Sequence, residues 1–313
     1  MSSLLCLSLR SMKEVTPPKA SVLCLGNFDG VHLAHQALIR KAVAFRNEQQ
    51  AQSAVSVFCF AEPPSRLLHP DKKPMLLCTM EQKLRALSEC GAEYVFLAQF
   101  SSLRDASPSD FVKQILLDTC HATAVVCGFN YRFGKGALGT PQMLRSLLPI
   151  PLILQEEIQL DGETVSSTRI RRLLTEGKTE EANRLLGRPF SFSAEVLHGK
   201  ALGHVMGFPT LNQLFPEGLL IPCHGVYASC ALVDGKTYHA ISNVGVHPTV
   251  DENAVLNCET YILHFDGDLY GRTVTVQLLS HLRAEESFRS LEQLIARIRK
   301  DVTVAEAYFS KER

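Results

Sequence analysis

Two histidines and an aspartate stand close together after a hydrophobic run. Residues 26–35 read G-N-F-D-G-V-H-L-A-H and follow the apolar stretch S-V-L-C-L. A strand that ends at a glycine and leads into a helix presents backbone N–H groups and the positive end of the helix dipole. His32 and His35 are one helical turn apart, so both imidazoles share a face. The combination indicates a phosphate site whose donors could stabilise charge during group transfer. H-x-x-H spacing alone would also fit ordinary core or surface histidines, or a metal-binding pair.

A second group of candidate phosphate donors lies in V-S-S-T-R-I-R, at residues 165–171. Hydroxyls at a helix start belong to the same kind of anion site. Arg171 then adds a forked donor that suits phosphate oxygens. An ordinary helix cap would use the same residues, so this stretch alone leaves both interpretations open. The hydroxyl residues are Ser166, Ser167 and Thr168.

Candidate cation ligands occur in the second half of the chain, where residues 207–212 read G-F-P-T-L-N. Thr210 and Asn212 are separated by one residue, so their oxygens point the same way from an extended chain. Hard oxygen ligands of this kind suit Mg²⁺, especially where phosphate completes the coordination. A structural Gly/Pro turn is the alternative for this stretch.

Glu259 is an unusual carboxylate, because it stands in the strand-like stretch C-E-T-Y-I-L-H-F. In an extended strand it would share a face with Tyr261, Leu263 and Phe265. A carboxylate on a face that is otherwise apolar suits a general base. A surface glutamate at a strand end is the alternative.

Composition limits the class of protein. A chain of 313 residues is too long for one comfortable core, so two domains are expected. Lys+Arg and Asp+Glu are both 32, and this balance disfavours a partner held through nucleic-acid phosphates. The apolar runs are far shorter than the ~20 residues that a spanning helix needs, so no membrane partner is expected. The oligomeric state stays open.

The cysteines and the start of the chain bear on its compartment. The ten cysteines are scattered without C-x-x-C spacing, and most stand in apolar stretches. They are therefore expected to be reduced core thiols rather than disulfides or zinc ligands. The first residues lack the basic region of a signal peptide. Together these features favour a cytoplasmic protein.

Strand-like and helical stretches alternate through residues 20–185. Nearly continuous apolar strands between amphipathic helices predict a parallel sheet covered on both faces, with the ligand outside the carboxyl ends of its strands. Thr79 is expected to cap the helix over 80–90. Strands are predicted over 21–26, 53–60, 92–98, 122–127 and 151–154, and helices over 34–49, 80–90, from 107, and around 140–148.

From about Pro189 the pattern changes to short strands joined by tight turns. Asp234-Gly235 is a hairpin signal. This half predicts a small antiparallel barrel closed by one helix. Strands are expected over 191–199, 225–236, 237–245, 258–265 and 271–279, and the helix carries an apolar stripe of Leu291, Leu294, Ile295, Ile298, Val302 and Ala305.

The motifs of the first half resemble those of a known superfamily. Residues 26–35 resemble the nucleotidyltransferase signature G-x-F-D-G-x-H-x-G-H, and residues 165–171 resemble its S-S-T-x-I-R segment. G-F-N-Y-R-F-G at 128–134 resembles the G-x-D-F-R-F-G loop of FAD synthetases. The resemblance implies a Rossmann-like adenylyltransferase that uses ATP. It assigns catalytic roles to His32, His35 and Arg171, phosphate or ATP contacts to Gly26, Asn27, Phe28, Asp29, Gly30, Ser166, Ser167 and Thr168, and flavin contacts to Asn130, Arg132 and Phe133.

The motifs of the second half resemble those of riboflavin kinases. G-F-P-T-L-N is similar to their G-F-P-T-A-N, N-V-G-V-H-P-T at 243–249 to N-x-G-x-x-P-T, and E-T-Y-I-L-H-F-D-G-D-L-Y-G to E-T-Y-I-x-D-F-x-x-D-L-Y-G. The resemblance implies Glu259 as the catalytic base and Thr210 and Asn212 as Mg²⁺ ligands. It assigns nucleotide or flavin contacts to Gly203, Gly207, Phe208, Pro209, Asn243 and Arg283.

In this order, the two halves resemble the bifunctional bacterial riboflavin kinase/FMN adenylyltransferases. The implied domains are residues 1–186 and 187–313, with ATP, riboflavin and FMN as small-molecule substrates and Mg²⁺ as cofactor. Three departures from the family motifs support an alternative function. They are Ala34 in place of glycine, Asn130 in place of aspartate, and C-F-A-E-P-P at 59–64, which lacks the family's histidine. In that alternative the kinase is active and the adenylyltransferase half is impaired. A flavin-binding regulatory protein with both sites silent is a second alternative.

Overall fold

The chain forms two compact units. The computed structural model describes residues 4–68, 74–198, 207–247 and 255–311. The units divide between Ser167 and Thr168. The second unit therefore includes α7 (Ser167–Thr175), except for its first residue, and α8 (Thr179–Leu186). The expected domain boundary, after residue 186, lies beyond these two helices and stays a prediction.

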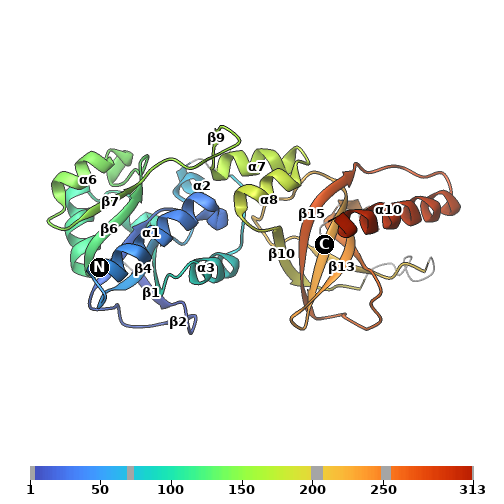
Figure 1. The fold of residues 1–313 in the computed structure, drawn as a ribbon, viewed down its shortest axis with the longest axis horizontal. Coiled ribbons are helices and arrows are strands. Elements are labelled where there is room, and N and C mark those ends of the chain that lie inside the picture. The colour runs from blue at the N-terminus through green and yellow to red at the C-terminus, as the bar shows by residue number, and fades with distance from the viewer. Residues whose placement is uncertain (1–3, 69–73, 199–206, 248–254, 312–313) are drawn as a thin grey trace. The chain divides into compact units, whose positions relative to one another are not determined.

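A seven-stranded sheet is the centre of the first unit (Figure 1). Its strand order is β2-β1-β5-β4-β3-β6-β7, and the five strands from β5 to β7 in that order run parallel. The pair β1–β2 adds an antiparallel edge next to β5. The strands are β1 (Leu4–Ser8), β2 (Lys13–Glu14), β3 (Ser21–Leu25), β4 (Ala54–Phe60), β5 (Tyr94–Ala98), β6 (Ala122–Gly128) and β7 (Leu152–Gln155).

Helices cover both faces of this sheet, because its strands alternate apolar side chains to both sides. Ile39 of α1 and Leu87 of α3 pack with Val57 on one face. Leu116 of η3 and Leu144 of α6 pack on the other face. The elements between the strands are η1 (Asp29–Val31), α1 (Leu33–Gln49), α2 (Pro64–Leu68), α3 (Met80–Glu89), α4 (Phe100–Leu103), α5 (Pro108–Asp110), η3 (Phe111–Thr119), η4 (Lys135–Ala137) and α6 (Pro141–Leu147), and the hairpin β8 (Gln159–Leu160) and β9 (Glu163–Thr164) follows β7.

The strand order reverses at β3. The chain leaves β3 toward β4 and β5 on one side and later returns to β6 on the other side of β3. In open α/β sheets, ligands bind at such a switch point, outside the carboxyl ends of the strands. The motif at residues 26–35 follows β3, and the motif at 128–134 begins at the last residue of β6. The topology therefore brings two motifs that are far apart in sequence to one edge of the sheet.

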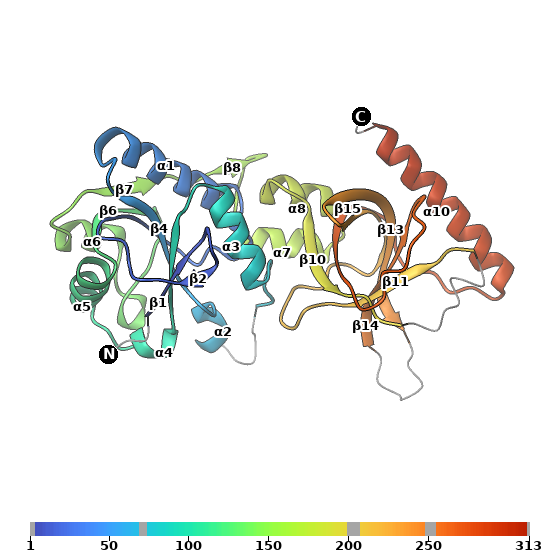
Figure 2. The same ribbon diagram turned by 90° about the horizontal axis from the view of Figure 1, so that it is seen from below.

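A six-stranded antiparallel half-barrel forms most of the second unit. Its order is β10-β15-β12-β13-β14-β11, and one bridge between Leu197 and Asn212 links the two edges. The helix α10 (Leu291–Lys311) lies beside β13 and β15 in both views (Figures 1 and 2). The strands are β10 (Phe190–Glu195), β11 (Thr210–Leu214), β12 (Gly225–Val233), β13 (Lys236–His247), β14 (Val255–Ile262) and β15 (Thr273–Arg283).

The structure confirms the fold class and several local signals. Thr79 caps α3 in a capping box with Gln82. Asp234 and Gly235 both have positive φ between the paired residues Val233 and Lys236, as a two-residue hairpin turn requires. None of the helices in the described ranges is both long and apolar enough to cross a lipid bilayer.

Other expectations were incomplete. The strands β1 and β2 were not expected from the sequence, and their antiparallel pairing makes the sheet mixed rather than purely parallel. No strand was expected between residues 199 and 225, whereas β11 begins at Thr210. In α10, Ala305 is buried, but Leu291 is 50% exposed and lies outside the packed stripe.

All ten cysteines are free, and eight of them are buried. Burial raises the pKa of the Cys258 thiol to about 11 and that of the Cys127 thiol to about 12. Cys90 and Cys223 are partly exposed. This pattern is that of thiols used as small core side chains.

We expect alkylation of the native protein to be selective. Because the thiolate is the nucleophile, raised pKa values and burial should protect the core cysteines at about pH 8. Iodoacetamide should therefore label Cys90 and Cys223 first, and Cys127 and Cys258 only after unfolding in guanidinium chloride. Mass spectrometry of the labelled peptides checks this order. Equal labelling of Cys127 and Cys223 in the native protein would contradict it.

Candidate active sites

The turn after β3 has an uncommon backbone conformation. Phe28, Gly30 and Val31 all have φ between 40° and 77°, in the left-handed region. Glycine adopts this region freely, but a phenylalanine or a valine there is strained. The turn is also closed to solvent, since Phe28 is fully buried and Asp29 is 3% exposed. Such strain persists only where the surroundings hold it, and it concentrates at functional sites.

The turn places two imidazole rings in contact. His32 precedes the first residue of α1, and His35 lies in its first turn. Their rings stack with centroids 3.7 Å apart at 16°, and the Phe28 ring lies 5.0 Å from that of His35. His32 is only 5% exposed. The structure therefore brings together the two histidines that the sequence analysis singled out, at the N-terminus of a 17-residue helix.

Hydrogen bonds from distant parts of the chain hold this turn. The Leu77 backbone N–H donates to Asp29 Oδ1 at 2.9 Å. The Gly30 N–H donates to Cys78 Sγ at 3.3 Å, and the Ser167 hydroxyl donates to the Asp29 carbonyl at 3.0 Å. The Asp29 carboxylate thus braces the loop, although the motif assigned it to ATP. That ATP contact stays a prediction, as does the one assigned to Ser167.

The other predicted phosphate-binding residues of the second motif stand close, in the sequence, to residue 167, where the first unit ends. Ser166 precedes α7 and is partly exposed, while Thr168 and Arg171 lie on α7. Their roles toward ATP stay predictions. Gly26 and Asn27 connect β3 to the turn, and a Cβ at Gly26 would come within 3.0 Å of the Phe28 ring. A side chain at position 26 would therefore press on the buried Phe28.

The loop after β6 carries the residues predicted for flavin. Asn130 and Arg132 are exposed. Phe133 is buried, and its ring lies 5.5 Å from that of Phe111 and 6.0 Å from that of Tyr131. Phe133 therefore anchors the loop to the core, while its two exposed neighbours remain accessible. Flavin binding by all three residues stays a prediction.

Strand register aligns four of the predicted kinase residues. Asn212 on β11 and Asn243 on β13 both pair with Glu259 on β14. Asn243 pairs in turn with Val226 on β12, which pairs with Arg283 on β15. Directly paired residues share a face, with Cβ atoms about 5 Å apart. The carboxylate of Glu259 is therefore flanked by two amide side chains on one face of the half-barrel.

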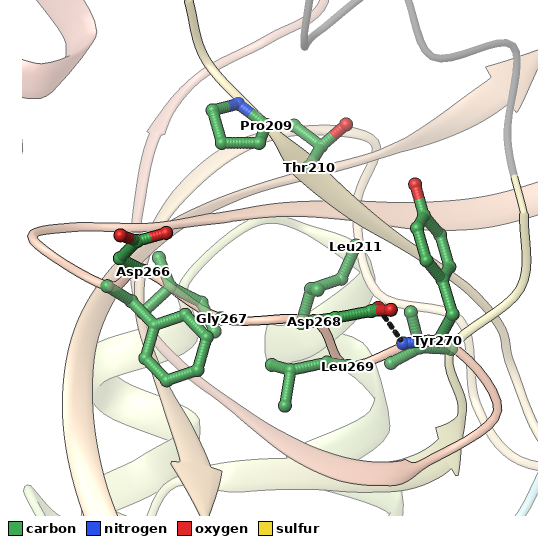
Figure 3. A pocket seen from close by; sticks show the side chains of 11 residues that line it. Pro209, Thr210, Leu211, Asp266, Gly267, Asp268, Leu269 and Tyr270 are labelled. Carbon is green, nitrogen blue, oxygen red and sulfur yellow. Dashed lines mark hydrogen bonds between the residues drawn. The ribbon is translucent and has the colours of Figure 1, made fainter.

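A pocket of about 400 Å³ lies beside Thr210, and none of the four residues of this row lines it. One wall is Pro209 with Thr210 and Leu211 of β11, and the other is the segment 265–270 between β14 and β15 (Figure 3). The Asp268 carboxylate accepts a hydrogen bond from the Tyr270 N–H at 2.9 Å. The volume is in the range of small-molecule sites, and apolar walls with a few polar groups are typical of them.

Thr210 and Asn212 fit a hard cation. They alternate on β11, so both side chains lie on the face of Glu259. Within the described ranges, neither the Thr210 hydroxyl nor the Asn212 amide has a hydrogen-bond partner. Their oxygens are therefore available to a ligand. Across the same ranges, no group of three or more His, Cys, Asp and Glu side chains is placed to hold a metal.

The other predicted kinase residues have distinct environments. Phe208 meets the ring of Tyr261 edge to face at 5.4 Å, and Gly207 has a φ of 80°. Gly203 lies outside the described residues. Arg283 donates from Nε at 3.0 Å and from Nη2 at 2.6 Å to the carboxylate of Asp301 on α10. Ligand binding by these residues stays a prediction, and Arg283 additionally joins β15 to the helix.

Sequence reasoning missed the residues that support the sites. Asp301 is 5% exposed and pairs with Arg283. Lys83 on α3 is 3% exposed, and its Nζ donates to the Asn27 carbonyl at 3.2 Å. A charged residue among the apolar positions of a predicted helix was the available signal for both.

Two family models match the chain, one for each half. The model described as FAD synthetase matches residues 15–169, and the model described as riboflavin kinase matches residues 186–309. The first carries the imidazole pair and the second carries the Glu259 row. The two units therefore define an adenylyltransferase and a kinase of flavin biosynthesis in one chain.

Relatives extend over nearly the whole sequence. Bifunctional riboflavin kinase/FMN adenylyltransferases from Listeria monocytogenes and Pseudomonas fluorescens are each 34% identical, over 93% and 96% of both chains respectively. A solved structure titled macrolide-efflux protein from Streptococcus pneumoniae is similar with a TM-score of 0.85 and 29% identity, over 96% of this chain and 97% of that one. The chain belongs to the bifunctional riboflavin kinase/FMN adenylyltransferase family.

We expect neutralisation of one partner of the Arg283–Asp301 pair to destabilise the second unit strongly. The two side chains are 14% and 8% exposed. Asp301→Asn leaves a buried guanidinium without its counter-charge and should lower the free energy of unfolding by about 3 kcal/mol. A urea unfolding curve, monitored by the loss of FMN formation, measures the change in the free energy of unfolding.

The matched control is Glu176→Gln, which breaks the half-exposed pair with Lys178 in the same unit. Exposed pairs contribute less than about 1 kcal/mol, so this variant should unfold close to the wild-type midpoint. Equal midpoints for the two variants would show that the buried pair does not stabilise the unit.

Proposed function

We propose that Glu259 is the general base of riboflavin phosphorylation. It takes the proton from the 5′-hydroxyl of the ribityl chain while that oxygen attacks the γ-phosphorus of ATP, and FMN and ADP form. The single observation that carries this proposal is the register that puts Glu259 between Asn212 and Asn243. Amide groups on both sides can orient a carboxylate and a substrate hydroxyl without neutralising the base.

Thr210 and Asn212 are the proposed ligands of Mg²⁺ in this half. Their neutral oxygens suit a cation that shares its coordination with substrate phosphates. When bound, Mg²⁺ supplies positive charge that offsets the charge of the phosphates. The pocket beside Thr210 is the proposed site for an aromatic ring of one substrate, because its walls include Leu211, Phe265 and Leu269.

In the first half, the proposed reaction is attack of the FMN phosphate on the α-phosphorus of a second ATP. The new bond joins the two phosphates of FAD, and pyrophosphate leaves. A phosphate nucleophile needs no general base, so positioning and charge neutralisation carry the step. These roles fall to His32, His35, the N-terminus of α1, and the hydroxyl and guanidinium groups of residues 166–171. The exposed Asn130 and Arg132 are proposed to contact the flavin.

The residues also support a proposal for where the protein acts. Both reactions consume ATP, and ten free cysteines are compatible with a reducing compartment. We therefore place the two reactions in the cytoplasm.

The first test is to incubate the purified protein with riboflavin, Mg²⁺ and ATP and to separate the flavins by chromatography. FAD is the expected final product, formed through FMN. FMN without FAD would support the alternative of an impaired adenylyltransferase half. Unchanged riboflavin would contradict the assignment of both sites.

Two substitutions should separate the reactions. His35→Ala should lower FAD formation from FMN by about 10²- to 10³-fold, because it removes a donor to charge in the transition state. It should leave FMN formation unchanged. Glu259→Ala should lower FMN formation by about 10²- to 10⁴-fold and leave FAD formation from supplied FMN unchanged. Loss of both reactions in one folded variant would refute the assignment of separate sites.

A third substitution tests the metal ligands. Asn212→Ala should raise the Mg²⁺ concentration for half-maximal FMN formation about tenfold, because one oxygen ligand is lost. The Mg²⁺ dependence of FAD formation in the same variant is the internal control and should not change. An unaltered Mg²⁺ requirement for FMN formation would rule out Asn212 as a ligand.

A further inference from the structure

Lys83 is a buried lysine that the two reactions leave without a role. It lies on the face of α3 that packs against the sheet, between buried residues such as Leu84 and Leu87, and is itself 3% exposed. Its Nζ donates a hydrogen bond of 3.2 Å to the carbonyl oxygen of Asn27. Asn27 is the second residue of the turn that carries Phe28 and the two histidines, so the ammonium group lies directly against the adenylyltransferase turn.

Burying a lysine at this position costs free energy of folding. An ammonium group has three donors, and within the described ranges Nζ has one hydrogen-bond partner, a neutral carbonyl. No carboxylate in those ranges forms an ion pair with it. The nearby Cys59 thiol offers no counter-charge, because burial raises its pKa. A methionine of the same length would be cheaper to bury.

The peptide that Lys83 contacts links it to the substrate side of the turn. In a planar trans peptide, the C=O of Asn27 and the N–H of Phe28 point in opposite directions. Since Lys83 draws the carbonyl to its own side, the Phe28 N–H points away from it. Within the described residues this N–H has no hydrogen-bond acceptor, although Phe28 is fully buried. A buried backbone donor without an acceptor indicates a ligand.

We propose that Lys83 is a positioning residue for FMN adenylylation. Its ammonium group fixes the Asn27–Phe28 peptide so that the Phe28 N–H donates to a phosphate oxygen of ATP. It also turns the negative end of the carbonyl dipole away from that phosphate. The positive charge of Lys83 is then balanced by the triphosphate when ATP binds, which accounts for a buried cation without a protein anion.

The test compares three variants in FAD formation from FMN and ATP. Lys83→Met removes the donor and the charge, and Lys83→Gln keeps a donor without the charge. Lys113→Met, at an exposed lysine on η3, is the control. Each variant is measured for kcat, for the KM of ATP and of FMN, for FMN formation, and for thermal unfolding.

Lys83→Met should lower kcat/KM for ATP about 10- to 100-fold, as expected for loss of a charge-assisted hydrogen bond. The KM for FMN and the kinase activity should stay the same. The melting temperature should stay the same or rise. Lys83→Gln should recover part of the loss, and Lys113→Met should match the wild type. A purely structural lysine would instead give a lower melting temperature and affect both substrates.

Wild-type kcat/KM for ATP in Lys83→Met would overturn the proposal. A parallel loss of stability and of affinity for both substrates would also overturn it. If Lys83→Met fails to fold, Lys83→Gln decides by the same criteria. The proposal depends on the adenylyltransferase activity, so the wild-type reaction is measured first. Absence of FAD there would count against that activity and not against the role of Lys83.

Discussion

The left-handed turn between β3 and α1 is the constraint on which the first unit depends. Phe28 and Val31 adopt a backbone region that costs roughly 1–3 kcal/mol for a residue with a side chain. Along this path the two imidazoles stack at the start of α1, and the buried Phe28 ring lies against that of His35. The compensation comes from contacts made by Leu77, Cys78 and Lys83. The segment leading into α3 is therefore part of the site, although it carries none of the signature residues.

In the second unit, the corresponding constraint is strand register. Side chains alternate along a strand, so a slip of one residue in β14 would move Glu259 to the other face, away from Asn212 and Asn243. Local turn chemistry fixes part of this register, since Asp234-Gly235 sets the pairing of β12 with β13. The contact of Arg283 with Asp301 then fastens β15 to α10. The geometry of the proposed catalytic residues here follows from strand pairing, whereas in the first unit it follows from a strained turn.

Features that depend on neighbouring residues could be predicted from the sequence, whereas contacts between residues far apart in the sequence could not. The capping box at Thr79, the hairpin turn and the apolar strands each depend on a few neighbouring residues, so pattern alone identified them. β11 was missed because G-F-P at its start is typical of a turn, although the strand begins at Thr210. The partnership of Lys83 with Asn27 joins residues 56 positions apart, and no local pattern reports such a contact. The alignment of Asn212 with Glu259 likewise appears only once the strands are paired.

The structure shows why Ala34 can replace the glycine of the family motif. Ala34 lies in the first turn of α1 and has no positive φ, so the conformation does not require the glycine of the resembled motif at this position. Alanine is in fact the better helix former by about 1 kcal/mol, which favours the helix start that presents His35. The positions where conformation does demand freedom or closeness, Gly26 and Gly30, keep glycine. The substitution therefore falls where the fold tolerates a methyl group.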